Sequence, residues 1–197
     1  MDYKNKILQL LNINNGLITT SQIVAQGIPK VYLTRMIRQG LIERVSRGVY
    51  LDNDAFDDEL YRLQMTYQRG IYSHGTALFL HDITDITPLY YTMTFPTGYN
   101  VPSLKNRGVT SFYVNKLKHA LGIITLSTNQ GRPIRTYNRE RSIVDILRNR
   151  NQLDSDMVIQ ALRSYVNRSD RDLITLMEYA KTFKVSRVLQ ERIEVLL

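Results

Sequence analysis

Residues 29–50, PKVYLTRMIRQGLIERVSRGVY, predict a short basic helix that leads directly into a basic hairpin. Pro29 opens the helix, since proline is tolerated at the first helical position. Gly40 closes it, because glycine readily takes the left-handed conformation that ends many helices. The apolar side chains fall on one half of the helix, which we expect to pack inward. They are Tyr32, Leu33, Met36 and Ile37.

The opposite half of this helix is basic and includes one small apolar side chain. It consists of Lys30, Val31, Thr34, Arg35, Arg38 and Gln39. A helix that reads DNA needs this mixture, because arginine donates two hydrogen bonds to guanine and a small apolar group contacts the thymine methyl. Lysine and arginine also neutralise phosphates. The simpler alternative is a basic face that only contacts solvent.

A basic hairpin is predicted after the helix. Residues 41–45 and 49–51 alternate and are rich in branched side chains, as expected of two short strands. The turn between them contains Gly48, which supplies the positive φ that a tight hairpin requires. Arg44 and Arg47 lie on or beside this turn and make the hairpin positive.

Two further helices are expected upstream, over residues 3–13 and 20–26. Three helices followed by a hairpin are the order of a winged helix-turn-helix. Its third helix would enter the major groove of DNA, and the hairpin would lie along the backbone or the minor groove. The alternative is a protein-interaction module, because winged helices also serve that purpose.

Composition indicates a folded protein without cysteine-based chemistry. The chain has 197 residues, of which 43% are hydrophobic and 22% charged, so it contains enough apolar material for a core. It has no cysteine, which excludes disulfides, zinc fingers and iron–sulfur clusters. The N-terminal residues do not resemble a signal peptide. No segment approaches the ~20 apolar residues of a membrane helix, and we expect a cytoplasmic protein.

Charge is unevenly distributed along the chain. The formal net charge of +8 and the sequence pI of about 9.7 favour a polyanionic partner such as nucleic acid. Residues 1–50 hold seven Lys or Arg and two acidic residues, whereas residues 51–70 hold five acidic residues and two arginines. This acidic run separates two basic regions. We therefore expect a winged helix-turn-helix domain over residues 1–54 and a second domain over residues 55–197.

The second domain is predicted to mix helices and strands. Helices are expected over residues 55–68 and 73–81, and strands over residues 89–95, 109–114 and 122–127. Four more helices are expected over residues 139–150, 154–166, 171–183 and 186–197. The whole chain is thus expected to be α+β, an N-terminal winged helix-turn-helix followed by a mixed α/β domain with a helical C-terminal end.

The second domain lacks two common catalytic motifs. It contains neither a Gly-x-x-x-x-Gly-Lys-Ser/Thr phosphate loop nor a Gly-x-Ser-x-Gly nucleophile elbow. His74 and His81 would form a metal site if they shared a helix face beside Asp82 and Asp85. We favour helix-end and turn roles for these residues. We therefore expect no catalytic residue, no metal and no cofactor.

A second basic cluster lies towards the C-terminus. It consists of Arg132, Arg135, Arg139 and Arg141, with Lys116 and Lys118 upstream. A solvated face is the simpler interpretation of this cluster. The alternative is a second surface that binds a polyanion or a protein.

Three segments together carry a resemblance to a known family. They are GLITTSQIVAQGIPKVYLTRMIRQGLIERVSRGVYL from residue 16, YSHGTALFLHDITDITP from residue 72, and RERSIVDIL from residue 139 followed by RDLITLMEYAK from residue 171. The chain resembles the AbiEi family from about residue 4 to residue 197. These proteins are abortive-infection antitoxins of bacterial type IV toxin–antitoxin systems, a form of phage defence.

The resemblance implies two functions. The winged helix-turn-helix would repress its own operon by binding inverted repeats of double-stranded DNA in the promoter, and the second domain would counter a nucleotidyltransferase-like toxin without a stable complex. The DNA-binding role would fall on Lys30, Val31, Thr34, Arg35, Arg38, Arg44, Ser46, Arg47 and Gly48. No family motif maps onto antitoxic residues, and charge alone suggests Arg132, Arg135, Arg139 and Arg141 as an antitoxic surface.

Two other readings remain open. The protein would be a plain transcriptional regulator if its second domain bound a ligand or formed oligomers. It would be an enzyme, such as a DNA-targeted nuclease, if Asp82 or Asp85 supported metal-dependent cleavage. The acidic residues are scattered and do not form a convincing metal-ligand cluster, so a non-enzymatic antitoxin and autorepressor is preferred.

Overall fold

The computed structural model describes residues 2–99, 104 and 108–196. Contacts within the chain divide it into two compact units. The N-terminal unit comprises Met1–Gln68 and Leu126–Ile134, and the C-terminal unit comprises Arg69–Thr125 and Arg135–Leu197. The expected boundary after residue 54 falls inside the N-terminal unit, so the division into domains 1–54 and 55–197 stays a prediction.

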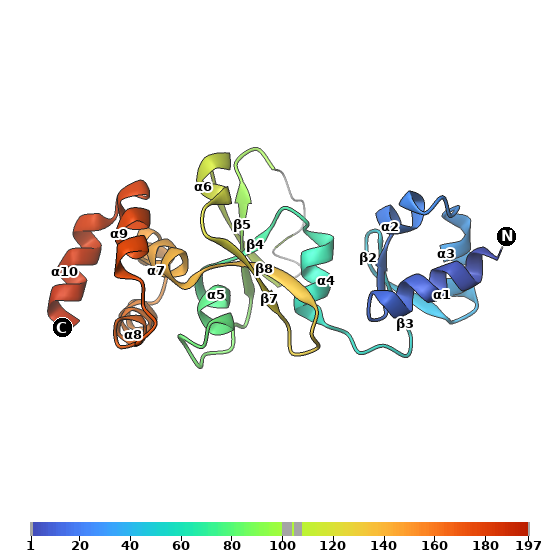
Figure 1. Ribbon diagram of the computed structural model, residues 1–197, viewed down its shortest axis with the longest axis horizontal. Helices are drawn as coiled ribbons and strands as arrows, with labels where there is room; N and C mark the ends of the chain where they lie inside the picture. Colours follow the sequence, from blue (N-terminus) through green and yellow to red (C-terminus); the bar gives the residue numbers. More distant parts are fainter. Residues whose placement is uncertain (1, 100–103, 105–107, 197) are drawn as a thin grey trace. The chain divides into compact units, whose positions relative to one another are not determined.

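The N-terminal unit contains a winged helix-turn-helix (Figure 1). Its elements are α1 (Tyr3–Ile13), β1 (Leu17–Thr19), α2 (Thr20–Ala25), α3 (Val31–Arg38), β2 (Ile42–Ser46), β3 (Val49–Asp52) and α4 (Glu59–Thr66). The three strands form an antiparallel sheet in the order β1-β3-β2. Strand β1 was not predicted, because all three of its residues are buried and no alternation marks it.

Helix α2 begins where the sequence predicts, at a capping box. The side chain of Thr19 accepts a hydrogen bond from the backbone N–H of Gln22, and the side chain of Gln22 accepts one from the backbone N–H of Thr19 at 2.7 Å. This arrangement satisfies two N–H groups that the first turn of a helix leaves unpaired. It therefore sets the start of the helix that precedes the turn into α3.

The core of the winged helix-turn-helix draws on most of its elements. It contains Ile7, Leu11, Ile18, Ile23, Ile28, Leu33, Met36 and Ile42. Only Leu33 and Met36 from the predicted apolar half of α3 are buried. Tyr32 is half-buried and Ile37 is exposed, so the inward face of α3 is narrower than predicted. Burial is confined to the side chains that point directly at the rest of the core.

The second sheet has five strands of mixed direction. They are β4 (Ile71–Tyr72), β5 (Tyr91–Pro96), β6 (Val109–Val114), β7 (Ile123–Ser127) and β8 (Pro133–Tyr137), in the order β6-β5-β4-β8-β7. Strand β4 pairs antiparallel with β5 and parallel with β8, and β5 pairs parallel with β6. Local sequence patterns predict individual strands but do not specify these long-range partners.

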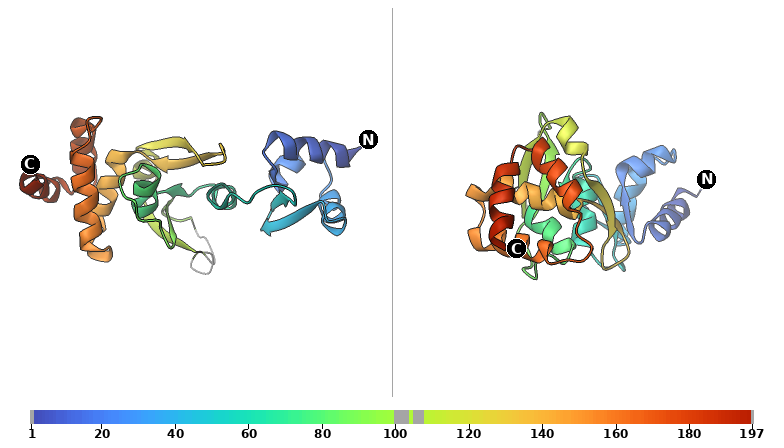
Figure 2. Two further views of the ribbon diagram at one scale, coloured as in Figure 1. Left: turned by 90° about the horizontal axis from the view of Figure 1, so that it is seen from below. Right: turned by 60° about the vertical axis from the view of Figure 1, so that its left-hand side comes forward.

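Helices complete the C-terminal unit. They are α5 (His74–Leu80), α6 (Lys116–Ala120), α7 (Arg139–Arg148), α8 (Ser155–Val166), α9 (Leu173–Thr182) and α10 (Ser186–Leu196). Figure 2 shows the C-terminal helices, coloured orange to red, gathered beside the second sheet. The chain is therefore α+β with a helical C-terminal end, as predicted. No helix among the described residues is long and apolar enough to cross a membrane.

One helix begins four residues later than predicted, and another was not predicted. Helix α4 begins at Glu59 instead of residue 55, because the side chain of Asp58 caps it by accepting from the N–H of Tyr61 at 3.0 Å. The short helix α6 was not predicted.

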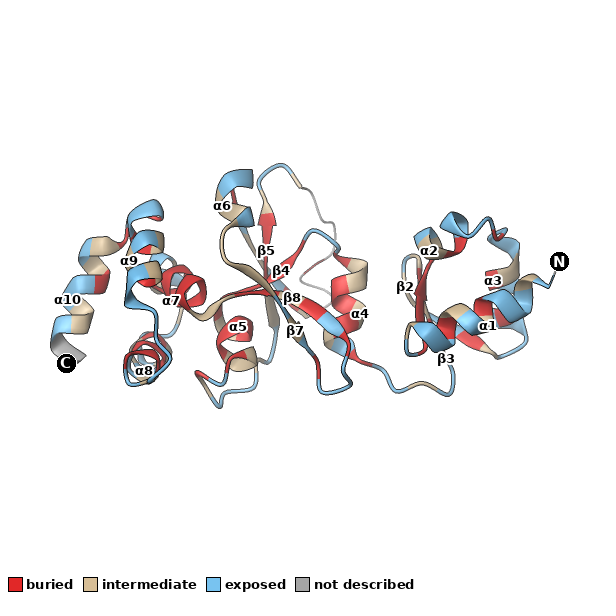
Figure 3. Ribbon diagram, viewed as in Figure 1, coloured by how far each residue is buried: buried red, intermediate tan, exposed pale blue. Residues whose placement is uncertain are grey.

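Helix α7 is buried on every side, and all residues from Glu140 to Leu147 lie in the interior (Figure 3). It is the central helix of the C-terminal core.

Candidate nucleic-acid interface

Helix α3 presents a basic face to solvent. Its exposed members among the predicted DNA-contacting residues are Lys30, Val31, Thr34, Arg35 and Arg38. Val31 is 49% exposed, although it is apolar. No acidic side chain lies within α3. The helix therefore offers hydrogen-bond donors, positive charge and one apolar contact on the same surface.

Arg35 rests against an aromatic pair. The Cζ atom of Arg35 lies 5.0 Å from the centre of the Tyr32 ring. The ring of Tyr32 in turn contacts the ring of Tyr3 from α1, with 5.0 Å between the ring centres. A guanidinium over an aromatic face is attracted to the ring electrons. This contact restricts the side chain of Arg35 before any ligand binds.

The hairpin forms a basic wing, as predicted. Arg44 and Arg47 are exposed on it. Gly48 has φ +76°, and its carbonyl oxygen accepts a hydrogen bond from the N–H of Thr20 at 2.8 Å. A side chain at Gly48 would meet Thr20 Oγ1 at 3.3 Å. Gly48 therefore connects the wing closely to the start of α2. Its expected contact with DNA stays a prediction.

Ser46 was expected to contact DNA, but its hydroxyl has a partner within the protein. Ser46 Oγ lies 2.7 Å from Thr66 Oγ1 of α4. Thr66 Oγ1 donates its proton to the carbonyl oxygen of Arg62 at 2.8 Å, so Ser46 is the donor in the first contact. Ser46 therefore joins the wing to α4. The sequence did not reveal this partner because it lies twenty residues further along the chain.

Two of the four arginines predicted as an antitoxic surface are buried, and Arg132 is the first of them. Its side chain is 4% exposed. Its Nη2 donates to the carbonyl oxygens of Asn15 and Phe56, and its guanidinium lies 5.6 Å from the ring centre of Tyr61. These contacts all lie within the N-terminal unit. Arg132 therefore stabilises that unit internally.

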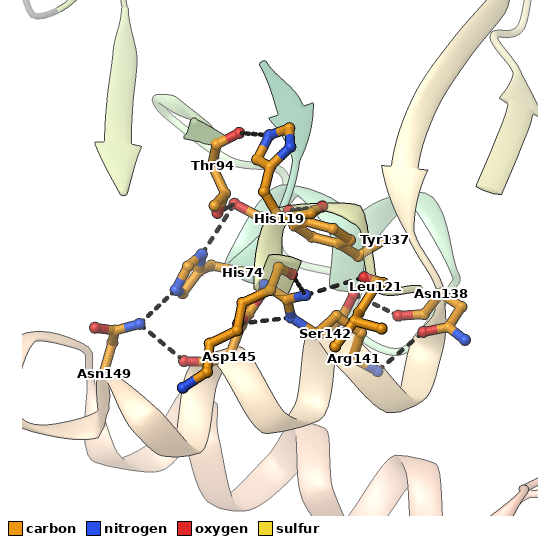
Figure 4. Close-up of polar contacts among 12 residues, drawn as sticks. His74, Thr94, His119, Leu121, Tyr137, Asn138, Arg141, Ser142, Asp145 and Asn149 are labelled. Carbon is orange, nitrogen blue, oxygen red and sulfur yellow. Dashed lines mark hydrogen bonds and ion pairs between the residues drawn. The ribbon is translucent and has the colours of Figure 1, made fainter. Parts of the chain in front are cut away.

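Arg141 is the second buried arginine, and its side chain is completely enclosed. Its Nε donates to Asp145 Oδ1 at 3.0 Å, and its Nη1 donates to the carbonyl oxygens of Lys118 and Leu121 at 2.6 and 3.0 Å (Figure 4). The guanidinium also lies 4.1 Å from the ring centres of both Tyr137 and Phe183. A fully buried side chain with these contacts is unavailable to a partner.

The other two arginines are only partly accessible. Arg139 is half-buried and pairs with Asp170, which also pairs with Arg168. Arg135 is half-buried, and its partial burial lowers its pKa. Charge counting along the sequence therefore misplaced this surface, because two of its four members belong to the interior.

His74 and His81 lie at the two ends of α5, in agreement with the helix-end roles preferred for them from the sequence. His74 is the first residue of α5, and His81 caps the other end of that helix. His74 lies between Ser73 Oγ and the side-chain amide of Asn149, at 2.9 and 2.8 Å (Figure 4). Burial, with a smaller effect from the charges of Arg141 and Arg148, lowers the pKa of His74 to about 3.

His81 is likewise held by the protein, because its Nε2 lies 2.7 Å from the carbonyl oxygen of Tyr137. Burial lowers the pKa of His81 as well. Across residues 2–99, 104 and 108–196, no three His, Asp or Glu side chains come together in a group that would hold a metal ion. The histidines and Asp82 and Asp85 therefore do not form the alternative metal site within this part of the chain.

The N-terminal unit is thus a winged helix-turn-helix with an exposed basic face. Residues 5–51 match the model of a family described as transcriptional regulator, AbiEi antitoxin. This match confirms the resemblance to the AbiEi family over the winged helix-turn-helix. It indicates an antitoxin or transcriptional regulator of an abortive-infection system, and the family is one of regulators rather than enzymes.

The fold as a whole is also found in a solved structure. The crystal structure of the RV2827C protein from Mycobacterium tuberculosis superposes with a TM-score of 0.62 and 13% sequence identity, covering 98% of this chain and 78% of that chain. At this identity the similarity concerns the fold alone. No curated protein sequence matches the chain.

Proposed function

We propose that the protein is a DNA-binding autorepressor and the antitoxin of a type IV toxin–antitoxin system. The observation that carries the DNA-binding part is the joint exposure of Arg35 and Arg38 on α3 and of Arg44 and Arg47 on the wing. These two elements are the ones that winged helices place against DNA. The family match over residues 5–51 supports the same assignment.

The ligand of this surface is double-stranded DNA, with inverted repeats in the protein's own promoter as the specific site. Inverted repeats require two copies of the winged helix-turn-helix, one on each half-site. Phosphate neutralisation by the exposed arginines supplies affinity, and contacts of α3 with base edges supply specificity. Binding therefore weakens steeply as the salt concentration rises.

DNA binding is tested by measuring the dissociation constant for a promoter fragment over a series of salt concentrations. The Arg35→Ala/Arg38→Ala variant is compared with wild type, and Arg187→Ala serves as a control because Arg187 is an exposed arginine on α10. We expect the double variant to bind at least tenfold more weakly and the control to bind like wild type. Unchanged affinity of the double variant would refute the DNA-binding proposal.

The antitoxic activity is assigned to the rest of the chain, and its target is a nucleotidyltransferase-like toxin. This assignment rests on the resemblance over the whole chain, because the family match covers only residues 5–51. The test expresses the toxin from an unrelated promoter together with the full-length protein or its Arg35→Ala/Arg38→Ala variant. Rescue by both proteins would separate antitoxicity from repression. Absence of rescue by wild type would leave a plain transcriptional regulator.

A further inference from the structure

The exposed residues of α3 occupy two different positions on the helix. Val31 and Arg38 are seven residues apart, which is two helical turns, so they lie on one line along the helix, opposite the buried Leu33 and Met36. This line is the middle of the exposed face. Arg35 lies to one side of it, next to the half-buried Tyr32. The two arginines of α3 are therefore not equivalent.

Arg35 is held at this edge of the helix. Its guanidinium lies over Tyr32, whose ring is fixed by contact with Tyr3 of α1. Both tyrosines pack against the core of the winged helix-turn-helix. A charged group already restricted in this way loses less conformational freedom when it meets a ligand. Arg35 is therefore suited to contact a phosphate group beside the groove.

Arg38 is unrestrained by comparison. Among the described residues, its side chain makes no hydrogen bond, ion pair or ring contact. Long side chains on a helix point back towards its N-terminus, which directs Arg38 over the turn that carries Thr34. Arg38 can therefore extend from the middle of the exposed face towards the floor of a groove.

We propose that Arg38 and Arg35 have different roles in DNA binding, an inference that rests on the proposed DNA-binding function. Arg38 reads guanine in the major groove, with Val31 and Thr34 beside it against a thymine methyl. Arg35 contacts a phosphate and carries no sequence information. Tyr32 is a positioning residue that holds Arg35 for this contact, and Tyr3 supports Tyr32.

The test uses the full-length protein with two DNA fragments, its own promoter and a scrambled sequence of equal length. The dissociation constants of both are measured between about 50 and 200 mM salt. We expect Arg38→Ala to weaken promoter binding about 10- to 100-fold and scrambled binding only a few-fold. We expect Arg35→Ala to weaken both equally and to reduce the slope of log affinity against log salt by about 1.

The positioning role is tested with two substitutions of the same residue. Tyr32→Phe keeps the ring under Arg35, and we expect it to bind both DNA fragments like wild type. Tyr32→Leu removes the ring, and we expect a few-fold loss on both fragments with an unchanged salt slope. Thermal unfolding of each variant shows whether the fold is retained, and the Phe variant controls for packing.

The outcomes separate this inference from the proposed function. If wild type binds both fragments equally, the proposed repressor function is refuted, and so are the different roles proposed for Arg38 and Arg35. If wild type prefers the promoter but Arg35→Ala abolishes that preference, only the assignment of different roles to Arg38 and Arg35 is overturned. Equal losses from Tyr32→Phe and Tyr32→Leu would overturn the positioning role of the ring.

Discussion

Arg141 and Asp145 lie one turn apart on α7 and form an ion pair whose side chains are 0% and 1% exposed. Burial raises the pKa of Asp145, and the charge and hydrogen bond of Arg141 oppose this rise. Removing two charges from water is costly, and close contact with further hydrogen bonds offsets that cost. Two backbone carbonyls and two aromatic rings around Arg141 supply those additional contacts.

Replacing Arg141 with methionine should destabilise the protein strongly. Asp145 would remain buried without its partner, and breaking a buried pair on one side costs about 3–5 kcal/mol. The measurement is the free energy of unfolding in urea. Arg187→Ala is the matched control, because Arg187 and Glu191 form a pair at the same spacing on the surface. Similar losses of unfolding free energy in both variants would show that burial does not make the Arg141–Asp145 pair more important for stability than the surface pair.

Acidification should destabilise the protein through its histidines. In the folded state the pKa of His74 is about 3, whereas an unfolded histidine has a pKa of about 6.5. Between these values the unfolded state binds a proton that the folded state does not. Stability is therefore retained above about pH 6.5 and falls by up to about 1.4 kcal/mol per pH unit as the pH drops towards 3.

The variant His74→Asn isolates this effect, because asparagine does not titrate. Its free energy of unfolding should depend less steeply on pH between about 6 and 4 than that of wild type, by about one proton. The burial-lowered pKa values of His81 and His119 contribute in the same direction in both proteins. Identical slopes for variant and wild type would show that His74 takes up a proton in the folded state.

Gly122→Ala should cost more stability than Gly131→Ala. Both glycines have positive φ, +76° and +74°, so each substitution imposes backbone strain of about 1–2 kcal/mol. At Gly122 a new Cβ would also lie 2.9 Å from Arg141 Cβ and from Asn138 Oδ1, whereas at Gly131 it meets open space. Thermal unfolding of the two variants measures the difference. Equal unfolding midpoints would mean that the backbone beside Arg141 yields without cost.

Ser46→Ala should leave DNA affinity within about twofold of wild type but lower stability by about 1 kcal/mol. Its hydroxyl donates to Thr66 and is not directed at a ligand. Promoter binding and urea unfolding are measured together. Arg47→Ala is the contrasting variant, because Arg47 is exposed on the same wing. It should weaken binding without loss of stability. A large affinity loss in Ser46→Ala would restore the DNA-contacting role expected from the resemblance.

The winged helix-turn-helix could be predicted because its signals are local. Pro29, Gly40 and Gly48 mark the ends of α3 and the turn of the wing within a few residues of the structures they shape. The basic face of α3 follows from helical periodicity alone. The exposure of Arg35 and Arg38 agrees with that prediction, whereas the half-buried Tyr32 shows that periodicity does not determine the width of the buried face.

The helices, the wing and the positive charge of the N-terminal region can be predicted from the sequence, because neighbouring residues produce each of these features. Which charges remain accessible depends on tertiary contacts. Arg141 is interior because the carbonyl oxygens of Lys118 and Leu121 and the ring of Phe183, each at least twenty residues away in the sequence, surround it. Ser46 is occupied because Thr66 lies beside it. Burial depends on contacts between distant segments, and a linear count of charges does not contain that information.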